Sequence, residues 1–251
     1  MLRNRPVGEF PGVLVLLGAI ALFAPEARAK STPVGTLTQV KNGVFLIHGA
    51  TGDWVKATKG ESVFASSRIK TGKDSRAQAR LLDGSVLRLG ANSELAIETA
   101  TLAPGQPQKQ LTAKLVAGKV WASVTRMLGF KSHFRVKTAN AVAGVRGTRF
   151  HTSVESDGSS RVKVYAGQVL VSNKPLYARK GDTRENRVEV PGPKEVTKKA
   201  WDELVASAMQ FVSVSATGKL SEARPFKVAS DADREWEAWN LAEDRTQGFT
   251  K

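Results

Sequence analysis

Apolar and polar residues alternate along most of the chain between residues 34 and 172. The clearest runs lie at 37–40, 86–89, 95–98, 134–137 and 161–164. A two-residue period places successive side chains on opposite faces of a strand, so each run predicts a strand with one buried face. Turn signals such as Asp83-Gly84 and Asp157-Gly158 separate the runs. We therefore expect an all-β domain of about ten or more short antiparallel strands.

Two short words recur within this β region. Residues 117–124 (AGKVWASV) resemble residues 166–172 (AGQVLVS), and Asp83-Gly84-Ser85 resembles Asp157-Gly158-Ser159. Repeated Gly-x-Val strand starts favour a rolled or solenoid-like sheet over an irregular sandwich. The alternative is that common hairpin words recur by chance, because the spacing between the copies is not constant.

The pattern changes towards the C-terminus. A segment rich in Pro and Gly, residues 176–194, is followed by apolar residues at helical spacing over 195–212. A second helix is predicted over 231–243, with acidic residues in its first turn. It places Trp236 and Trp239 three residues apart, and such a pair is expected to pack on the parent domain rather than to stack on a ligand.

The first 29 residues have the order of a cleavable signal peptide. Arg3 and Arg5 precede an apolar run at 13–24, and small residues follow at Ala27 and Ala29. The run is shorter than the roughly 20 residues of a membrane span, which is the alternative interpretation. We expect cleavage after Ala29, a periplasmic or secreted location, and no stable membrane span afterwards. The expected divisions are 1–29 signal peptide, 30–175 β domain, 176–194 connecting segment and 195–251 helical C-terminal extension.

Charge narrows the choice of partner. The chain carries 38 Lys and Arg against 23 Asp and Glu, a net charge of +15. That excess by itself indicates nucleic acid, but an exported protein has little access to it, so we expect no nucleic-acid partner and instead an envelope protein or an anionic envelope polymer. Residues 30–175 hold 22 Lys and Arg against 8 Asp and Glu, whereas 176–251 hold 13 of each. Alternation predicts a basic, solvent-facing strand surface formed by Arg80, Arg88, Lys114, Arg135, Lys137, Arg161 and Lys163. The alternative is a solvated face with no specific partner.

Catalytic and metal-binding motifs are missing from the sequence. It contains no cysteine, and His48, His133 and His151 stand in no metal-ligand spacing. It also lacks a nucleophile elbow, a phosphate loop and a dinucleotide fingerprint. We expect no catalytic residue, no metal ligand, no cofactor and no enzymatic activity.

Two glycines flank a Val-Arg pair in the word Gly144-Val145-Arg146-Gly147-Thr148. Glycine inside a strand pattern usually marks a bulge or a sharp bend. Arg146 at such a bend has two interpretations. The one we favour is structural, with Arg146 donating hydrogen bonds to neighbouring carbonyls or to a carboxylate across the turn. The alternative is that Arg146 contacts a partner.

Five words of this chain, in their order and approximate spacing, resemble the FecR domain. They are Thr71-Gly72-Lys73-Asp74-Ser75-Arg76-Ala77, Leu82-Asp83-Gly84-Ser85 through Leu89-Gly90, Ala117-Gly118-Lys119-Val120, Gly144-Val145-Arg146-Gly147-Thr148-Arg149-Phe150 and Ala166-Gly167-Gln168-Val169. The resemblance covers roughly residues 41–172 and implies an extracytoplasmic, FecR-like rolled β domain, here followed by a short helical tail. The family tends to have Thr-Pro shortly before the fourth word, whereas this chain has Thr138-Ala139.

The resemblance also implies two functions. In iron-uptake systems FecR proteins relay a signal from an outer-membrane transporter to a sigma factor, through a cytoplasmic segment ahead of an internal membrane helix. Only 12 residues precede the apolar run here, so the chain looks similar to the stand-alone, secreted type. We expect a non-enzymatic binding or scaffold module of the cell envelope that acts through its basic face. The alternative is a component of FecR-type sigma-factor signalling that senses a transporter or ligand.

Overall fold

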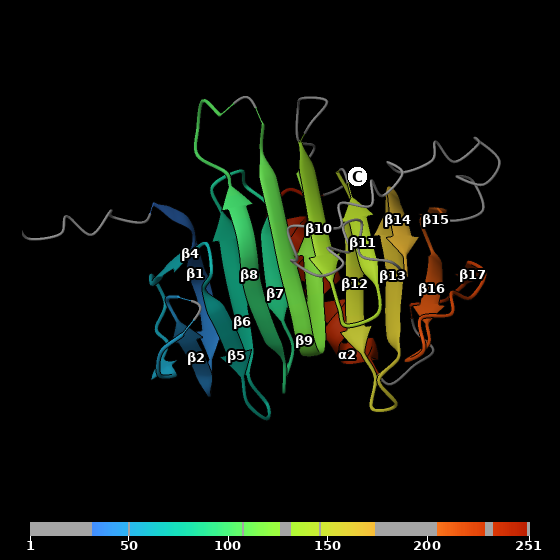
Figure 1. Cartoon of the computed structure of the whole chain (residues 1–251), viewed down its shortest axis with the longest axis horizontal. Helices are drawn as coiled ribbons and strands as arrows, with labels where there is room; N and C mark the ends of the chain where they lie inside the picture. Colours follow the sequence, from blue (N-terminus) through green and yellow to red (C-terminus); the bar gives the residue numbers. More distant parts are fainter. Residues whose placement is uncertain are drawn as a thin grey trace, which may run out of the picture. The chain divides into compact units, whose positions relative to one another are not determined.

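A computed structural model describes residues 32–49, 51–106, 108–125, 132–145, 147–173, 205–228 and 233–249. These residues belong to one compact unit, Ser31–Lys251. They form 17 β-strands and one helix, α2 (Arg234–Thr246) (Figure 1). The predicted signal peptide lies outside the described residues. Within the described ranges, no helix has the length and apolar character that a membrane span requires.

Nine strands pair side by side in one layer of the sheet, which we call layer A. Their spatial order is β4 (Ser62–Phe64), β1 (Pro33–Lys41), β6 (Arg76–Leu81), β7 (Val86–Leu89), β9 (Gln110–Ser123), β12 (Arg149–Val154), β13 (Ser160–Ala166), β16 (Gln210–Val214) and β17 (Arg224–Pro225).

A second layer, layer B, shares the long strand β9 with layer A. Its spatial order is β3 (Val55–Lys56), β2 (Val44–Ile47), β5 (Arg68–Thr71), β8 (Glu94–Thr101), β9, β10 (His133–Lys137), β11 (Val142–Val145), β14 (Gln168–Ser172) and β15 (Val205–Ser207). All strand pairs in both layers are antiparallel except β9 with β10, which is parallel. The expectation of a rolled, many-stranded β domain with a short C-terminal helix is confirmed, and the sheet is mixed because of this one parallel pair.

The hydrophobic core lies between the two layers. Alternate residues of both layers point inwards and belong to one buried cluster, as the two-residue period predicts. Representative members are Leu37, Leu87, Val120 and Phe150 from layer A, and Leu46, Ile69, Leu115 and Phe134 from layer B.

Glycines stand where the chain crosses from one layer to the other. Strand β9 passes from layer B to layer A at Gly118, where φ is +76°, and the chain passes back between β13 and β14 at Gly167, where φ is +81°. Both conformations favour glycine. A Cβ atom would also meet Ser93 Oγ at 2.4 Å in the first case and Thr148 Cγ2 at 2.7 Å in the second. The repeated Ala-Gly-x-Val word therefore marks two equivalent layer crossings and has a structural meaning.

The repeated Asp-Gly-Ser word forms two equivalent hairpin turns in layer A. Asp83 accepts a hydrogen bond from the Ser85 amide at 3.0 Å, and Asp157 accepts one from the Ser159 amide at 2.9 Å. Hydrogen bonds from Ser159 hold the pKa of the Asp157 carboxyl below its ordinary value. Gly84 and Gly158 follow with φ of +84° and +78°. These turns join β6 to β7 and β12 to β13, as the hairpin signals predict.

The helix predicted over 195–212 is wrong in the part that the structure describes. Residues 205–207 form β15 at the edge of layer B, and Gln210–Val214 form β16, which pairs with β13 in layer A. The word Val212-Ser213-Val214 alternates, and both valines are buried. Pairing with an existing sheet edge therefore overrides the local helical spacing. The second predicted helix, 231–243, is confirmed as α2, three residues further along. Residues 174–204, which include the predicted connecting segment, lie outside the described residues.

Candidate functional site

Helix α2 packs on the outer face of layer A, behind the strands as they are drawn in Figure 1. Its inward face is largely polar. Glu237, Asn240 and Asp244 are completely buried, and Trp236 is 4% exposed. Residues spaced by three and four positions share one face of a helix. A stripe that is usually apolar is thus occupied by acidic and amide side chains, so the helix is held on the sheet mainly by ionic and hydrogen-bonding contacts.

Asp244 is the centre of a buried hydrogen-bond network. Its carboxylate accepts hydrogen bonds from Arg88 Nη1 at 2.7 Å, from Ser123 Oγ at 2.6 Å and from Trp121 Nε1 at 3.0 Å. Arg88 also donates to Gln78 Oε1 at 2.7 Å. The Arg88 and Asp244 side chains are both 0% exposed. A buried ion pair is tolerated only where further hydrogen bonds satisfy its lone pairs and protons. This network supplies partners for both Asp244 oxygens and for Arg88 Nε and Nη1, whereas Arg88 Nη2 has no hydrogen-bond partner among the described residues.

Two further acids of the C-terminal segment bind lysines of layer A. Lys163 Nζ donates to Glu237 at 2.8 Å, and Lys119 Nζ donates to Asp233 at 2.5 Å. Asp233 stands at the N-terminal cap of α2, but its side chain does not cap the helix. The acidic residues predicted in the first turn of this helix therefore neutralise the sheet beneath it.

Aromatic side chains complete the helix–sheet contact. Trp236 belongs to a small buried cluster with Trp121 and Tyr165, and Trp239 packs against that cluster. The expectation that the tryptophan pair packs on the parent domain is confirmed.

The predicted basic face is divided between two surfaces. Arg80, Arg88, Arg161 and Lys163 lie on β6, β7 and β13 of layer A, whereas Lys114, Arg135 and Lys137 lie on β9 and β10 in layer B. The expectation of solvent exposure is wrong for Arg88 and Lys163, which are 0% and 3% exposed beneath α2. The reason is that alternation identifies the outer side of a strand but does not say which element covers it.

The remaining two layer A cations are half-buried. Arg80 Nη2 donates to Gln247 Oε1 at 2.7 Å, just beyond the end of α2. Arg161 lies 3.9 Å from the Glu155 carboxylate and 5.7 Å from the ring centre of Phe211. Neither side chain is fully open to solvent, so layer A does not present the free basic surface that the sequence predicts.

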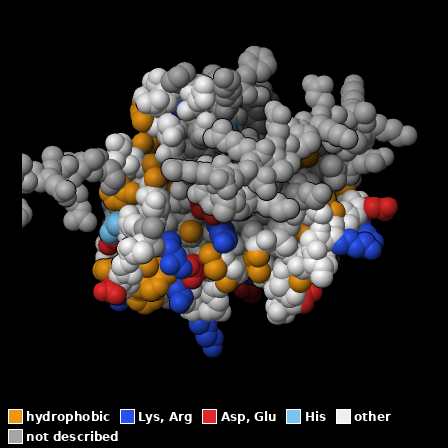
Figure 2. Space-filling model, in the orientation of Figure 1, with side chains coloured by type: hydrophobic (Ala, Val, Ile, Leu, Met, Phe, Trp, Pro, Cys, Tyr) orange, Lys and Arg blue, Asp and Glu red, His pale blue; other side chains and the backbone are white. Residues whose placement is uncertain are grey.

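The cations of layer B lie on the opposite, outward side of the core. The parallel register places Lys137 beside Lys114 and Arg135 beside Thr112. Lys114 is exposed, Arg135 is half-buried, and Lys137 donates to Glu98 at 2.8 Å. Figure 2 shows Lys and Arg side chains among acidic and hydrophobic ones on the visible face, rather than in one uninterrupted basic patch.

The Gly144–Thr148 word (GVRGT) lies at another layer crossing. Gly144 and Val145 belong to β11 in layer B, and Gly147, with φ of +64°, leads to β12 in layer A. The carbonyl of Thr148 accepts a hydrogen bond from the Val124 amide at 2.8 Å. The bend that the glycines predict is therefore present. Arg146 lies outside the described residues, and its role stays a prediction.

His151, Asp233 and Glu237 gather at the start of α2, with potential ligand atoms within 4.8 Å of one another. This spacing alone would suit a metal ion. However, Lys119 and Lys163 already donate to the two carboxylates, and their ammonium groups supply the positive charge that a metal would supply. We therefore assign the cluster to helix docking.

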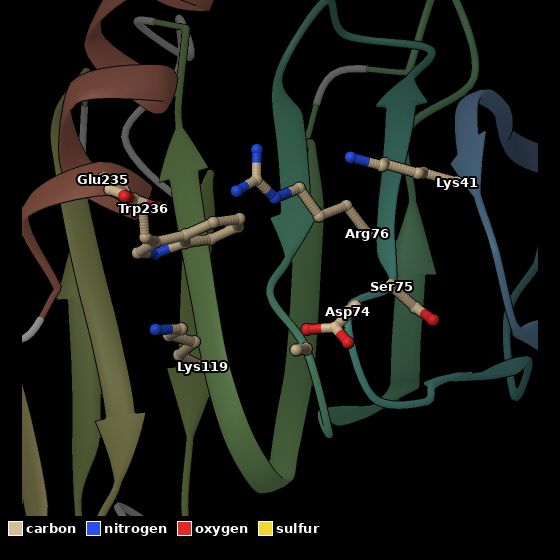
Figure 3. Close-up of a pocket in the computed structure, with 8 residues that line it drawn as sticks. Lys41, Asp74, Ser75, Arg76, Lys119, Glu235 and Trp236 are labelled. Atoms are coloured by element: carbon tan, nitrogen blue, oxygen red, sulfur yellow. The ribbon is translucent and has the colours of Figure 1, made fainter.

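A small pocket opens beside the first turn of α2 (Figure 3). Its volume is about 260 Å³, and it lies between β6, the end of β1, β9 and the helix. Figure 3 shows Trp236 reaching from the helix towards Arg76 of β6, with Lys41 on the far side of Arg76. The lining residues are Lys41, Asp74, Ser75, Arg76, Ala91, Lys119, Glu235 and Trp236.

The Asp233 contact makes helix docking sensitive to acid. Burial opposes ionisation of Asp233, but the hydrogen bond from Lys119 and the charges of His151, Lys119 and Lys163 outweigh it and hold the pKa of Asp233 below 3.8. A lowered pKa contributes stability above the ordinary pKa, and that contribution is lost as pH falls through the lowered value. We expect α2 to loosen below about pH 4, seen as a change in tryptophan fluorescence. Asp233→Asn should reduce this acid sensitivity, and identical pH profiles for the two proteins would contradict the assignment.

The polar residues on the inward face of α2 were not identified as site residues from the sequence. Asp233, Glu237, Asn240 and Asp244 are spaced by four, three and four positions, which is the spacing of one helix face. The spacing shows that these residues share one face of the helix. It does not show that this face is buried, because a helix face is expected to be buried when its residues are apolar and a polar face is normally assigned to solvent.

One protein-family model matches the central part of the β domain. The structure defines a rolled β-sheet protein in which three of the five sequence words coincide with glycine-marked layer crossings, at Gly118, Gly147 and Gly167. Residues 67–170, from the turn before β5 to within β14, match the family model described as FecR protein. The chain therefore contains a FecR domain.

Two crystal structures of a proposed anti-sigma factor from Parabacteroides distasonis ATCC 8503 are similar to the chain, each at 19% sequence identity and a TM-score of 0.44. The matches cover 69% of this chain and 63% and 64% of the other. The chain thus spans less than two thirds of the length of these relatives. A comparison with curated proteins finds no match.

Proposed function

We propose that this protein is a non-enzymatic FecR-domain binding module of the cell envelope. The observation that carries the proposal is the group of layer B cations, Lys114, Arg135 and Lys137, which α2 does not cover. These three side chains project from neighbouring strands and suit an anionic partner, either an envelope polymer or an acidic envelope protein. The family is regulatory, which supports a role without catalysis.

The proposed location rests on the N-terminal segment of the sequence. A positive region, an apolar run and a small-residue cleavage site support export. Mass spectrometry of the protein purified from cells should find a mature N-terminus at Lys30. An intact segment 1–29 would overturn the periplasmic or secreted location.

A second candidate function is FecR-type signalling, which the match over residues 67–170 favours. In that case the domain would be presented to a transporter or sensor at the membrane. An intact N-terminal segment, together with loss of sigma-dependent transcription on deletion of the gene, would favour signalling over the binding module.

Neutralising the three layer B cations should weaken retention on anionic envelope polymers. The triple variant carries Lys114→Gln, Arg135→Gln and Lys137→Gln and so loses three positive charges. Each charge contributes about 1 kcal/mol of binding free energy near an anionic surface, so we expect roughly 100-fold weaker binding at low salt. Retention on purified cell wall and on lipopolysaccharide should be measured across a salt series. Wild-type binding should fall as salt rises, because screening weakens charge-driven attraction.

A matched control removes two lysines and one arginine elsewhere on the surface. Lys59, Lys219 and Arg224 are exposed and outside the layer B group. Their combined replacement by Gln makes the same change in net charge and should leave most of the retention intact. Equal loss in both triple variants would show that net charge alone drives binding and would contradict a layer B site. Retention of neither polymer by the wild type would direct the search to an acidic protein.

A further inference from the structure

Each of four basic side chains beneath α2 binds an acidic or amide side chain of the C-terminal segment. Arg88 binds Asp244, Lys119 binds Asp233, Lys163 binds Glu237, and Arg80 binds the amide of Gln247. Arg76 of β6 departs from this pattern. Among the residues that the structure describes, Arg76 and its neighbour Lys41 form no ion pair and no side-chain hydrogen bond.

The guanidinium of Arg76 is held by aromatic rings instead of by an acid. Its central carbon lies 4.8 Å from the ring centre of Trp239 and 5.9 Å from that of Trp236. A cation–π contact of this kind holds the guanidinium near the rings without using its N–H groups as hydrogen-bond donors. The side chain is half-buried, so it is preorganised without being closed off from solvent.

The free cations face the pocket beside the first turn of α2. Figure 3 shows Arg76 and Lys41 side by side on its wall, with the Trp236 ring opposite. A volume of about 260 Å³ accommodates a small molecule but not a folded partner. Two donors for an oxyanion therefore line one small pocket, to which the nearly buried Trp236 contributes little surface, and two unpaired cations in such a pocket suit the carboxylate of a small organic acid.

Two acids of the same pocket restrict the ligand further. Asp74 and Glu235 also line it, and Lys119 is already engaged by Asp233. The negative charge of Asp74 and Glu235 repels a polyanion, so the pocket favours a ligand with one anionic group over inorganic phosphate. A fork of parallel N–H groups matches a planar carboxylate in particular.

We propose that this pocket binds a small monocarboxylic acid. The carboxylate is held by Arg76 and Lys41. The site is separate from the layer B cations, so it does not depend on the proposed anionic envelope partner.

The test uses benzoate as the probe and the mature chain as the protein. Titration calorimetry should show saturable binding to the wild type, with benzamide, the neutral isostere, and phosphate at matched ionic strength binding at least about tenfold more weakly. Arg76→Gln keeps much of the side chain but removes the charged fork, and it should weaken benzoate binding by at least about tenfold, as expected for a charge-assisted bidentate contact. Lys59→Gln is the control, because Lys59 is exposed and does not line the pocket.

Three outcomes would overturn the site: no saturable benzoate binding to the wild type, equal binding of benzamide or phosphate, or unchanged binding by the Arg76 variant. Arg76 is half-buried, so its folding should be checked by circular dichroism. If the Arg76 variant does not fold, benzoate binding by Lys41→Gln tests the site instead, because Lys41 is exposed and its replacement leaves the core intact. Weaker benzoate binding by this second variant supports the site, and unchanged binding refutes it. Failure here would leave the layer B result unaffected, because the two experiments use different residues and probes.

Discussion

Replacing Asp244 with asparagine is expected to lower the free energy of unfolding by about 3–5 kcal/mol, the usual cost of leaving a buried charge without its partner. The carboxylate accepts three hydrogen bonds, from Arg88, Ser123 and Trp121, and the Arg88 side chain is 0% exposed. An amide of the same shape cannot balance the Arg88 charge. Urea unfolding followed by circular dichroism would measure the loss.

The protein has one way to limit this cost, which is to release α2. Water would then reach Arg88, and the loss would be capped at the free energy of docking the helix. Release of α2 should appear as faster cleavage of the C-terminal segment by protease and a shift in tryptophan fluorescence, because Trp236 and Trp239 leave the sheet. The Asp244 variant is therefore expected to lose either global stability or helix docking.

Two companion variants make this prediction specific. Arg245→Gln alters the neighbouring exposed residue and should change stability by no more than about 0.5 kcal/mol. Arg88→Met combined with Asp244→Asn removes both charges, and it should recover part of the loss, because a neutral pair of similar volume tolerates burial better than a lone charge. An Asp244 variant as stable as the wild type, with α2 still docked, would show that the network contributes nothing to stability.

Replacing Gly118 with alanine is expected to be the most damaging single glycine change in the FecR domain. At a φ of +76° an alanine costs about 1–2 kcal/mol through backbone strain alone. Its Cβ would in addition lie 2.4 Å from Ser93 Oγ and 2.5 Å from the backbone oxygen of Asn92. Because the Asn92 backbone cannot move aside without disturbing β8, we expect a total loss above about 3 kcal/mol or failure to fold.

Gly105→Ala separates the two causes of this effect. Gly105 has a similar φ of +80°, but nothing lies within 4 Å of the position that a Cβ atom would occupy. It should therefore show the backbone strain without the collision, a loss of about 1–2 kcal/mol. Thermal or urea unfolding of both variants is the measurement. Equal losses would mean that the close approach at the layer crossing is unimportant.

The docked helix α2 covers part of the positive charge that the sequence places on the β domain. The +15 of the chain is concentrated in the β domain, but part of the positive charge of layer A faces the acids of α2. The surface available to an outside partner is accordingly less basic than the strand pattern predicts. A partner that is recognised through charge must therefore meet layer B, or displace the helix.

Much of the fold could be predicted from the sequence because its determinants are local. The two-residue period identified the strands of the core, and Asp83-Gly84-Ser85 and Asp157-Gly158-Ser159 identified two hairpins. Strands β15 and β16 were mistaken for part of a helix. Their helical spacing is weak, and their strand state depends on pairing with β14 and β13, which the local sequence does not specify.

The candidate site depended on tertiary structure to a much greater extent. Arg88 and Asp244 are 156 positions apart, and Trp121 and Asp244 are 123 apart. No local pattern relates such residues. The sequence by itself determined that the protein has a FecR-like, rolled β domain of many short strands with a short C-terminal helix, because alternation and turn residues act over a few neighbouring residues. Only the tertiary structure decided which cations face solvent, because the polar side of a strand becomes a surface or an interface according to the element that packs on it.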